Sequence, residues 1–403
     1  MIKRLYILAV GMIAMLACGS TKSQEQVKES NVQTQQERIV MGAEQLDMYL
    51  PQLKGKRVGL LVNQTSRIDN VHLVDSLHSL GVNLQYIFAP EHGFRGDADA
   101  GAHISDSKDS KTGVEIISIY GKNKKPGPEY MDQLDVVVFD IQDVGARFYT
   151  YISSMHYMME ACAESGTKMM VLDRPNPNGD YVDGPILEPS QKSFVGMHPI
   201  PIVHGLTVGE LALMINDEGW LEGGKSCDLT VIPAKNYDHS RAYSLPVKPS
   251  PNLPNDVAIR LYPSICFFEA TPVSIGRGTD FPFQVIGYND TTMGDFTFTP
   301  RSIQGAASNP ILKGEKCYGD DLRGIANSKF TLQYILTWHK MFKEKGMDLF
   351  SRAKWMDKLS GTDKLRKQIE AGMTEEEIKE SWEPELKAYN EIRRKYLLYP
   401  DFE

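Results

Sequence analysis

The 403-residue sequence lacks the features of several large protein classes. It has no excess of basic residues, because its net charge is -8, and a phosphate backbone requires a basic face, so we expect no nucleic-acid partner. Its five cysteines show no C-x-x-C spacing, which argues against a zinc site. No P-loop, G-x-S-x-G or H-E-x-x-H motif is present, and we expect neither a cofactor nor a bound metal. With 41% hydrophobic and 24% charged residues, the composition is typical of a globular protein.

The sequence also lacks an apolar run long enough to span a bilayer. Residues 5–16 are apolar but too short, and they follow two basic residues, so residues 1–18 are typical of a signal peptide. The sequence MLAC at 15–18 resembles a bacterial lipoprotein signal, with ordinary secretion as the alternative. Residues 19–38 are polar and predict a flexible tether. We therefore expect an exported protein that faces the periplasm and contacts the membrane only through acyl chains on Cys18.

Short apolar runs alternate with helical patterns from residue 57 to about 232. Strands are predicted at 57–62, 84–89, 114–119, 136–140 and 168–172, and helices at 72–80, after residue 150 and after Thr207. Strands without polar alternation, separated by helices, indicate a mostly parallel sheet that is covered on both faces. We expect an α/β, Rossmann-like domain over 39–262, followed by a smaller α+β domain over 263–403.

Polar and charged residues follow each predicted strand. Parallel strands end at one edge of a sheet, and ligands bind at that edge in open sheets of this kind, so we expect these residues to line one cleft. They are Asn63 after the first strand, Glu91, His92 and Arg95 after the second, Tyr120 after the third, Asp140, Gln142, Asp143, Arg147 and Tyr149 at and after the fourth, and Asp173 and Arg174 after the fifth.

Glu91 is the strongest single candidate for a catalytic residue. A carboxyl group at the edge of a sheet can act as a proton donor, whereas the structural alternative is a salt bridge to Arg95. His92 is a candidate for binding substrate. Asp140 and Asp143 are candidate second carboxylates, although Asp143 could instead cap the following helix.

A second group of candidates lies in the predicted C-terminal domain. The sequence GRGTD at 276–280 places glycines on both sides of Arg277, which indicates a backbone that approaches a ligand closely. Arg277 would then bind an anionic group from the other side of the cleft, with Glu269 and Asp280 nearby. The structural alternative is a salt bridge from Arg277 to Glu269 or Asp280.

Taken together, the motifs resemble one bacterial family, the exo-β-N-acetylmuramidases, which were formerly a domain of unknown function. The resemblance covers the chain from about residue 40 to the C-terminus. It rests on PEHGFRG, DIQDVGARFYTY, LDRPNP, HGLTVGELA, SPNLP, YPSICFFEATPVSIGRGTDFPF and KYLLY.

This resemblance implies a glycoside hydrolase with a Rossmann-like domain, a smaller auxiliary domain and an active-site cleft between them. The implied reaction releases β-linked N-acetylmuramic acid from the non-reducing end of peptidoglycan fragments in cell-wall recycling, and the implied catalytic glutamate is Glu91. Glycoside cleavage usually needs a second group, for which Asp140, Asp143 and Glu269 are candidates, unless the 2-acetamido group of the substrate serves. The lactyl carboxylate of the substrate would explain Arg147, Arg174 and Arg277.

Two other functions compete with this interpretation. A divalent ion surrounded by Glu91, His92, Asp140, Asp143 and Asp173 would indicate a metal-dependent hydrolase of the cell envelope. A lipid-tethered protein that binds muropeptides without cleaving them would share the same tether and arginines.

Overall fold

The computed structural model describes residues 37–91, 93–95, 107–325 and 327–403, so the predictions for Cys18 and His92 lie outside the described residues. Its main feature is a seven-stranded sheet with the order β5-β6-β4-β1-β7-β8-β9. All pairs are parallel except the edge pair β5 and β6. The strands are β1 (Arg57–Val62), β4 (Asn83–Ala89), β5 (Ser107–Lys108), β6 (Glu115–Ser118), β7 (Val136–Asp140), β8 (Lys168–Leu172) and β9 (Leu229–Ile232).

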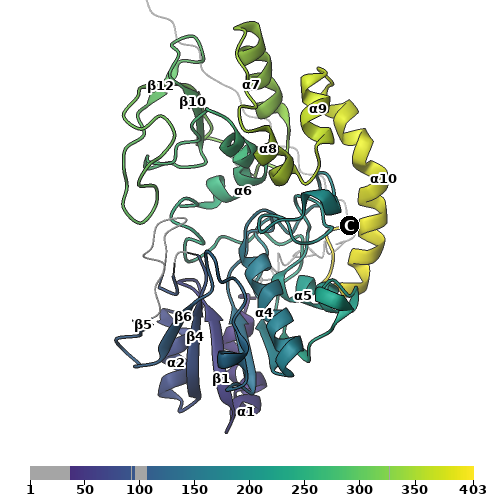
Figure 1. Ribbon diagram of the computed structural model, residues 1–403. Helices are drawn as coiled ribbons and strands as arrows, with labels where there is room; N and C mark the ends of the chain where they lie inside the picture. The colour runs from purple at the N-terminus through teal and green to yellow at the C-terminus, as the bar shows by residue number, and fades with distance from the viewer. Residues whose placement is uncertain (1–36, 92, 96–106, 326) are drawn as a thin grey trace, which may run out of the picture. The chain divides into compact units, whose positions relative to one another are not determined.

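Helices cover both faces of this sheet (Figure 1). One face packs against α1 (Leu46–Leu53) and α2 (Leu73–Ser79), and the other against α3 (Pro128–Met131), α4 (Tyr151–Ser165) and α5 (Val208–Asp217). Alternate residues of β7 explain this arrangement, because Val136 and Val138 are buried on the first face while Val137 and Phe139 are buried on the second. The predicted mostly parallel α/β sheet is confirmed.

The C-terminal part is smaller and mixed. It contains an antiparallel sheet of β10 (Val285–Tyr288), β12 (Cys317–Asp321) and β11 (Phe296–Phe298). Its helices are α6 (Asp256–Ile265), α7 (Gln333–Glu344), α8 (Ala353–Ser360), α9 (Lys364–Glu370) and α10 (Glu375–Arg393). The remaining short elements are the hairpin β2 (Arg67–Ile68) and β3 (Val71–His72) and the 3-10 turns η1 (Gly42–Glu44), η2 (Pro189–Gln191), η3 (Glu222–Gly224), η4 (Cys266–Ala270) and η5 (Arg394–Tyr396).

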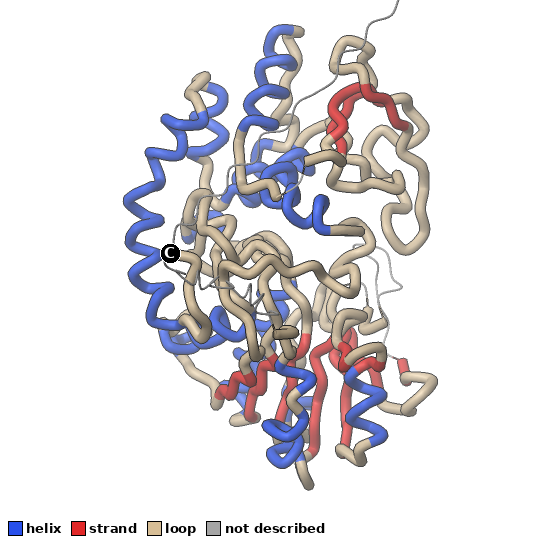
Figure 2. Tube along the Cα trace, turned by 180° about the vertical axis from the view of Figure 1, so that it is seen from behind, coloured by secondary structure: helices blue, strands red, loops and turns tan. Residues whose placement is uncertain are grey.

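One hydrophobic core continues from α4 and α5 into the C-terminal helices, and residues 38–403 form one compact unit. The view in Figure 2 shows the strands of the large sheet side by side. Helix α10 ends against the segment before α5, where Tyr389 donates a hydrogen bond to the His204 carbonyl at 2.7 Å. The division of the chain at residue 262 stays a prediction. No helix in the described ranges is long and apolar enough to cross a membrane.

Two helix starts follow the sequence closely. Thr207 and Glu210 form a capping box at the start of α5, and Thr374 and Glu377 form another at the start of α10. Cys162 is a fully buried residue of α4. The four cysteines in the described part of the chain are all buried and unpaired.

Candidate active site

Glu91 lies in the loop that follows β4, and residues of two neighbouring segments hold it in place. Tyr120, after β6, donates a hydrogen bond to Glu91 Oε1 at 2.9 Å, and Thr150, before α4, donates to Oε2 at 3.2 Å. Tyr151 donates to the Glu91 carbonyl at 3.3 Å. Gly93 turns the loop with φ of 76°, a conformation that favours glycine. Both carboxyl oxygens of Glu91 therefore accept hydrogen bonds from neutral hydroxyl groups.

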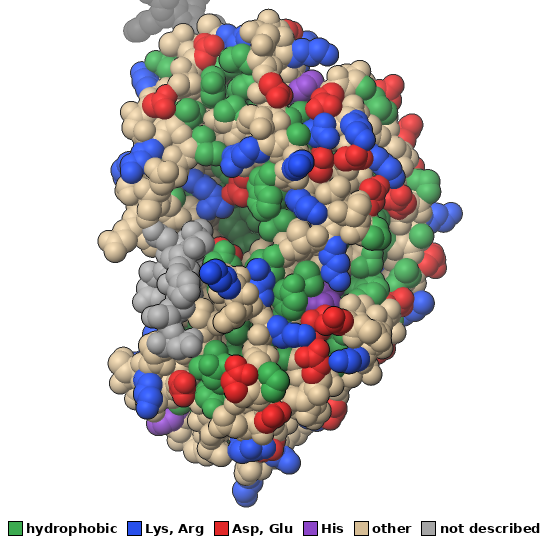
Figure 3. Space-filling view, in the orientation of Figure 1, with side chains coloured by type: hydrophobic (Ala, Val, Ile, Leu, Met, Phe, Trp, Pro, Cys, Tyr) green, Lys and Arg blue, Asp and Glu red, His purple; other side chains and the backbone are tan. Residues whose placement is uncertain are grey.

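A cavity of about 370 Å³ opens beside Glu91. Figure 3 shows a hollow with hydrophobic side chains at its floor and charged side chains at its edge. The lining comes from both the sheet side and the C-terminal part: Glu91, Tyr120, Phe148, Tyr149, Thr150, Tyr151, Ser193, Phe194, Val195, Ser250, Asn252, Leu253, Tyr262, Glu269, Arg277, Phe283 and Trp355. The volume is at the small end of the range for small-molecule sites.

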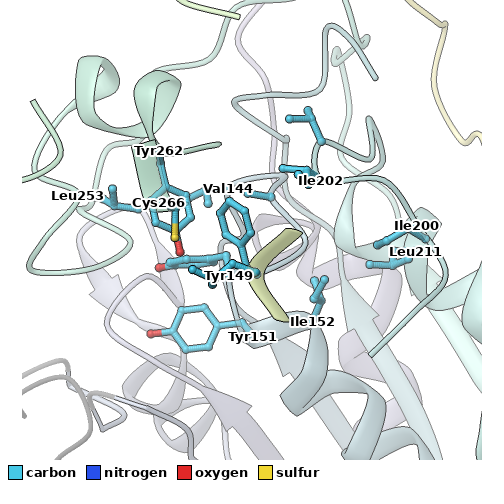
Figure 4. Packing of buried hydrophobic residues seen from close by; sticks show 14 of the residues in the cluster. Val144, Tyr149, Tyr151, Ile152, Ile200, Ile202, Leu211, Leu253, Tyr262 and Cys266 are labelled. Carbon is cyan, nitrogen blue, oxygen red and sulfur yellow. The ribbon is translucent and has the colours of Figure 1, made fainter. Parts of the chain in front are cut away.

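Aromatic rings form much of this lining. The ring of Tyr149 meets that of Tyr151 at 5.1 Å and that of Tyr262 at 6.0 Å, in edge-to-face geometry (Figure 4). The Tyr149 hydroxyl donates to the Pro249 carbonyl at 2.7 Å. Burial raises the pKa of Tyr149 well above its usual range, and nearby Tyr151 and Asp143 add to the effect. The hydroxyl therefore stays neutral at physiological pH.

Arg277 and Glu269 contribute the charged side of the cavity in the C-terminal part. The Arg277 Nε donates to Glu269 Oε1 at 2.8 Å, Nη2 donates to the same oxygen, and the guanidinium lies 5.0 Å from the Phe283 ring centroid. Burial lowers the pKa of Arg277, but the charge and hydrogen bonds of Glu269 outweigh burial and raise it. The Arg277 side chain is 31% exposed, so this fixed cation remains open to the cavity.

Five of the predicted site residues line this cavity: Glu91, Tyr120, Tyr149, Glu269 and Arg277. They come from segments up to 186 positions apart in the chain, and the shared edge of the sheet brings three of them together, as expected. Their roles in binding or catalysis stay predictions. Arg277 and Glu269 form the salt bridge that was given as the structural alternative, and both residues also line the cavity. The structural and functional alternatives therefore do not exclude one another.

Asp140 and Arg174 were expected in the cleft, but they do not line this cavity. Arg174 Nε and Nη2 each donate to one oxygen of Asp140, and both side chains are buried. The pair joins the ends of β7 and β8, and Arg174 borders a different cavity. Asp173 is also fully buried, where it accepts hydrogen bonds from Thr207 and Tyr399.

Arg147 was also expected in the cleft, but it does not line this cavity. It is fully buried and donates to the carbonyl groups of Pro185, Ile200, Leu359 and Ser360. Burial lowers the pKa of Arg147 to about 9. The side chain links the segment after β8 to the end of α8, which is a structural role.

The other predicted residues are also engaged outside the cavity lining. Arg95 pairs with Asp109 at 2.9 Å and Asp75 at 3.2 Å, so it does not form the alternative salt bridge to Glu91. Asp280 is exposed and pairs with Arg301 at 2.6 Å. Three buried polar side chains in the loops after β1 and β7 bond to backbone groups. Asn63 accepts a hydrogen bond from the Thr65 N–H, and Asp143 accepts one from the Gly145 N–H. Gln142 donates to the Pro175 carbonyl.

Two of the residues expected around a metal ion are engaged by other protein groups. Asp140 is occupied by Arg174, and Asp173 by hydroxyl and backbone donors. Within the ranges that the structure describes, no three His, Cys, Asp or Glu side chains are grouped as metal ligands.

Several cavity residues were missed in the sequence. Thr150 lies within the DIQDVGARFYTY motif, so its place next to Glu91 could have been inferred from that motif. Trp355 lies on α8, whose buried face contains Met356 and Leu359. The helical spacing of these residues places Trp355 on the exposed face of the helix, where a large apolar side chain is a signal of a contact surface. Phe194 follows a proline-rich loop that gives no such signal.

Comparison with known proteins decides the family. The model for the N-terminal part of "Exo-beta-N-acetylmuramidase NamZ" matches residues 58–257, and the model for its C-terminal part matches residues 260–399. The chain belongs to the NamZ exo-β-N-acetylmuramidase family. The resemblance expected from the motifs is thereby confirmed.

NamZ relatives match almost the whole chain. The peptidoglycan β-N-acetylmuramidase NamZ of Bacillus subtilis (strain 168) is 38% identical, with 96% of each chain covered. A crystal structure of a DUF1343 family protein from Bacteroides fragilis NCTC 9343 has a TM-score of 0.83 at 48% identity and covers 91% of this chain and 100% of its own. A second protein of that family and organism has a TM-score of 0.77 at 30% identity, covering 90% and 99%.

Proposed function

We propose that the protein is a glycosidase that releases β-linked N-acetylmuramic acid from the non-reducing end of peptidoglycan fragments, in cell-wall turnover. The observation that carries this proposal is one small cavity with the Glu91 carboxyl on the sheet side and the Arg277 guanidinium on the C-terminal side. A relative that matches 96% of the chain is named a peptidoglycan β-N-acetylmuramidase. The Glu91 carboxyl can donate a proton to the glycosidic oxygen of this sugar, and the Arg277 guanidinium can bind its lactyl carboxylate.

Glu91 is the proposed proton donor to the leaving oxygen. Glycoside cleavage needs a protonated carboxyl next to the glycosidic bond. Among the described residues Glu91 has no ion-pair partner, and its neighbours Tyr120 and Thr150 are neutral donors. Glu269, the other carboxylate in the described cavity lining, is paired with Arg277. Glu269 is bonded to a cation, whereas Glu91 accepts hydrogen bonds from neutral hydroxyl groups, and this difference favours Glu91 over Glu269 as the acid.

Arg277 is the proposed binding group for the lactyl carboxylate. It is the one arginine in the described cavity lining, whereas Arg147 and Arg174 are buried in other contacts. Its Nε and Nη2 both donate to a single oxygen of Glu269, and its side chain is partly exposed. Guanidinium groups bind carboxylates in directional hydrogen bonds, so Arg277 would distinguish N-acetylmuramic acid from N-acetylglucosamine, which lacks the lactyl group.

The location of the protein is proposed from its N-terminal sequence. Residues 1–18 carry the pattern of an export signal, and the polar segment that follows would tether the folded part to lipid on Cys18. Replacing Cys18 with Ser should move the protein from the membrane fraction to the soluble periplasmic fraction. An unchanged membrane fraction would contradict lipid attachment at this residue.

The activity is tested by hydrolysis of matched chromogenic substrates. The purified mature protein should release the chromophore from an aryl β-N-acetylmuramide and not from the matching N-acetylglucosaminide, with the same rate after treatment with a strong chelator. Release from neither substrate, by protein that still binds muropeptides, would contradict the proposed reaction. Loss of activity with the chelator would instead support a metal-dependent hydrolase.

A further inference from the structure

Trp355 differs from the other tryptophans of the chain. Trp338 and Trp382 are buried, and Trp220 is half-buried against His198, whereas Trp355 is 37% exposed and lines the cavity. Large apolar side chains are usually buried, because their transfer out of water is favourable. An exposed indole at the edge of a ligand cavity therefore indicates a surface that a ligand covers.

The position of Trp355 is fixed by its helix. Helix α8 buries Met356 and Leu359 on its inner face, so Trp355 lies on the outer side. Lys358 donates from α8 to the carbonyl groups of Ser190 and Lys192 in the facing loop, each at 3.4 Å. At the start of the helix, Arg352 donates to the Thr271 carbonyl at 3.0 Å, just after the turn that carries Glu269. These hydrogen bonds attach the helix that carries Trp355 to both sides of the cavity.

Phe194 presents a second ring to the same cavity from the sheet side. Its loop is closed by paired backbone hydrogen bonds between Ser193 and Gly196, and Ser153 donates to the Phe194 carbonyl at 2.7 Å. The Phe194 ring stacks on Tyr157 with an interplanar angle of 16° and a centroid distance of 6.3 Å. Phe194 is therefore supported by the Tyr157 ring.

The size of the cavity sets which part of a glycan these rings can meet. A volume of about 370 Å³ is at the lower limit for a small ligand, and it is consistent with one sugar residue. An exo-acting enzyme encloses the terminal sugar, so the rest of the glycan must leave through the open side. Trp355 is the most exposed member of the aromatic lining among the described residues, which places it on that open side.

We infer that Trp355, together with Phe194, forms a second sugar subsite that binds the residue on the leaving side of the scissile bond, an N-acetylglucosamine in peptidoglycan. This inference rests on the proposed function. The ring face of a pyranose carries C–H groups that stack on an aromatic surface. The Trp355 indole N–H has no hydrogen-bond partner among the described residues, so it can donate to a hydroxyl or acetamido oxygen of that sugar.

The test compares the binding of one sugar and of two sugars to a protein that does not turn them over. In the full mature chain carrying Glu91→Gln, calorimetry measures the Kd for N-acetylmuramic acid and for the disaccharide with N-acetylglucosamine on its reducing side. The disaccharide should bind about 10-fold more tightly than the monosaccharide. Adding Trp355→Ala should abolish this difference and leave monosaccharide binding unchanged, whereas Trp355→Phe should retain most of the difference.

Lys354→Ala is the matched control, because Lys354 is the exposed neighbour on the same helix and does not line the cavity. It should leave both Kd values unchanged. If Trp355→Ala weakened the binding of the monosaccharide and of the disaccharide equally, the inference would be overturned, because the ring would then contact the terminal sugar. An undiminished preference for the disaccharide in that variant would also overturn it, while the proposed function would stand. Binding of neither sugar to the Glu91→Gln parent would contradict the proposed function itself.

Discussion

Replacing Arg277 with Met removes the cation that we assign to the lactyl carboxylate. A hydrogen bond to a charged group contributes about 1.5–3 kcal/mol, so kcat/KM for an aryl β-N-acetylmuramide should fall about 10- to 150-fold. The same change exposes the Glu269 carboxylate, which Arg277 now neutralises through Nε and Nη2. This unpaired negative charge would repel the substrate carboxylate and enlarge the loss.

The Glu269→Gln variant separates the two contributions. Alone it leaves the Arg277 charge in place, so the muramide should retain most of its kcat/KM. Combined with Arg277→Met it removes the repulsion, and the double variant should therefore be more active on the muramide than Arg277→Met alone. Steady-state kinetics of the four proteins, with melting curves as a check of folding, measure this cycle. The reasoning would be refuted if Arg277→Met lowered muramide kcat/KM less than about threefold.

Three further changes test the bonds around the site. Tyr120→Phe removes a donor to Glu91, so kcat on the disaccharide should fall about 10-fold with KM nearly unchanged; a raised KM at constant kcat would contradict a positioning role. Arg147→Met leaves four carbonyl groups without their donor, and urea titration should show a loss of about 3 kcal/mol in the free energy of unfolding; unchanged stability would contradict this. Burial, with the charge of Glu210, raises the pKa of Asp173 to about 6. Because this pKa lies above that of an aspartate in the unfolded chain, protonation of Asp173 stabilises the folded protein, by on the order of 3 kcal/mol. This stabilisation is fully present below about pH 4 and is lost as the pH rises through about 6. Asp173→Asn should remove this pH dependence, and an identical profile would contradict it.

The sheet could be predicted because its strands are short apolar runs without polar alternation. Residues 57–62 and 136–140 are strands in the structure at the predicted bounds, and the Thr207 capping box marks the start of α5. Burial on both faces leaves this pattern in the sequence directly. The two short antiparallel strands β5 and β11 carry no comparable pattern.

The site could be predicted only in part, because the end of a strand fixes where a residue lies but not where its side chain points. Glu91 and Tyr120 face the cavity, whereas Asp140 turns to Arg174 and Arg147 to four carbonyl groups. These partners are up to 213 positions away in the chain, and no local pattern reports them. The helical pattern of α8 places Trp355 on the outer face of that helix, but it does not show that this face meets the cavity after folding.

The most direct test of the account is the turnover of the disaccharide of N-acetylmuramic acid and N-acetylglucosamine by Glu91→Gln. The natural disaccharide is preferable to an aryl substrate here, because an aryl leaving group needs little protonation and would hide the loss of the acid. Gln keeps the shape of Glu91 and an oxygen that can accept the Tyr120 hydrogen bond, but it cannot donate the proton. The account predicts a fall in kcat of about 10²- to 10⁴-fold with sugar binding retained. A kcat within a few fold of the unchanged protein would contradict the assignment of Glu91 as the acid.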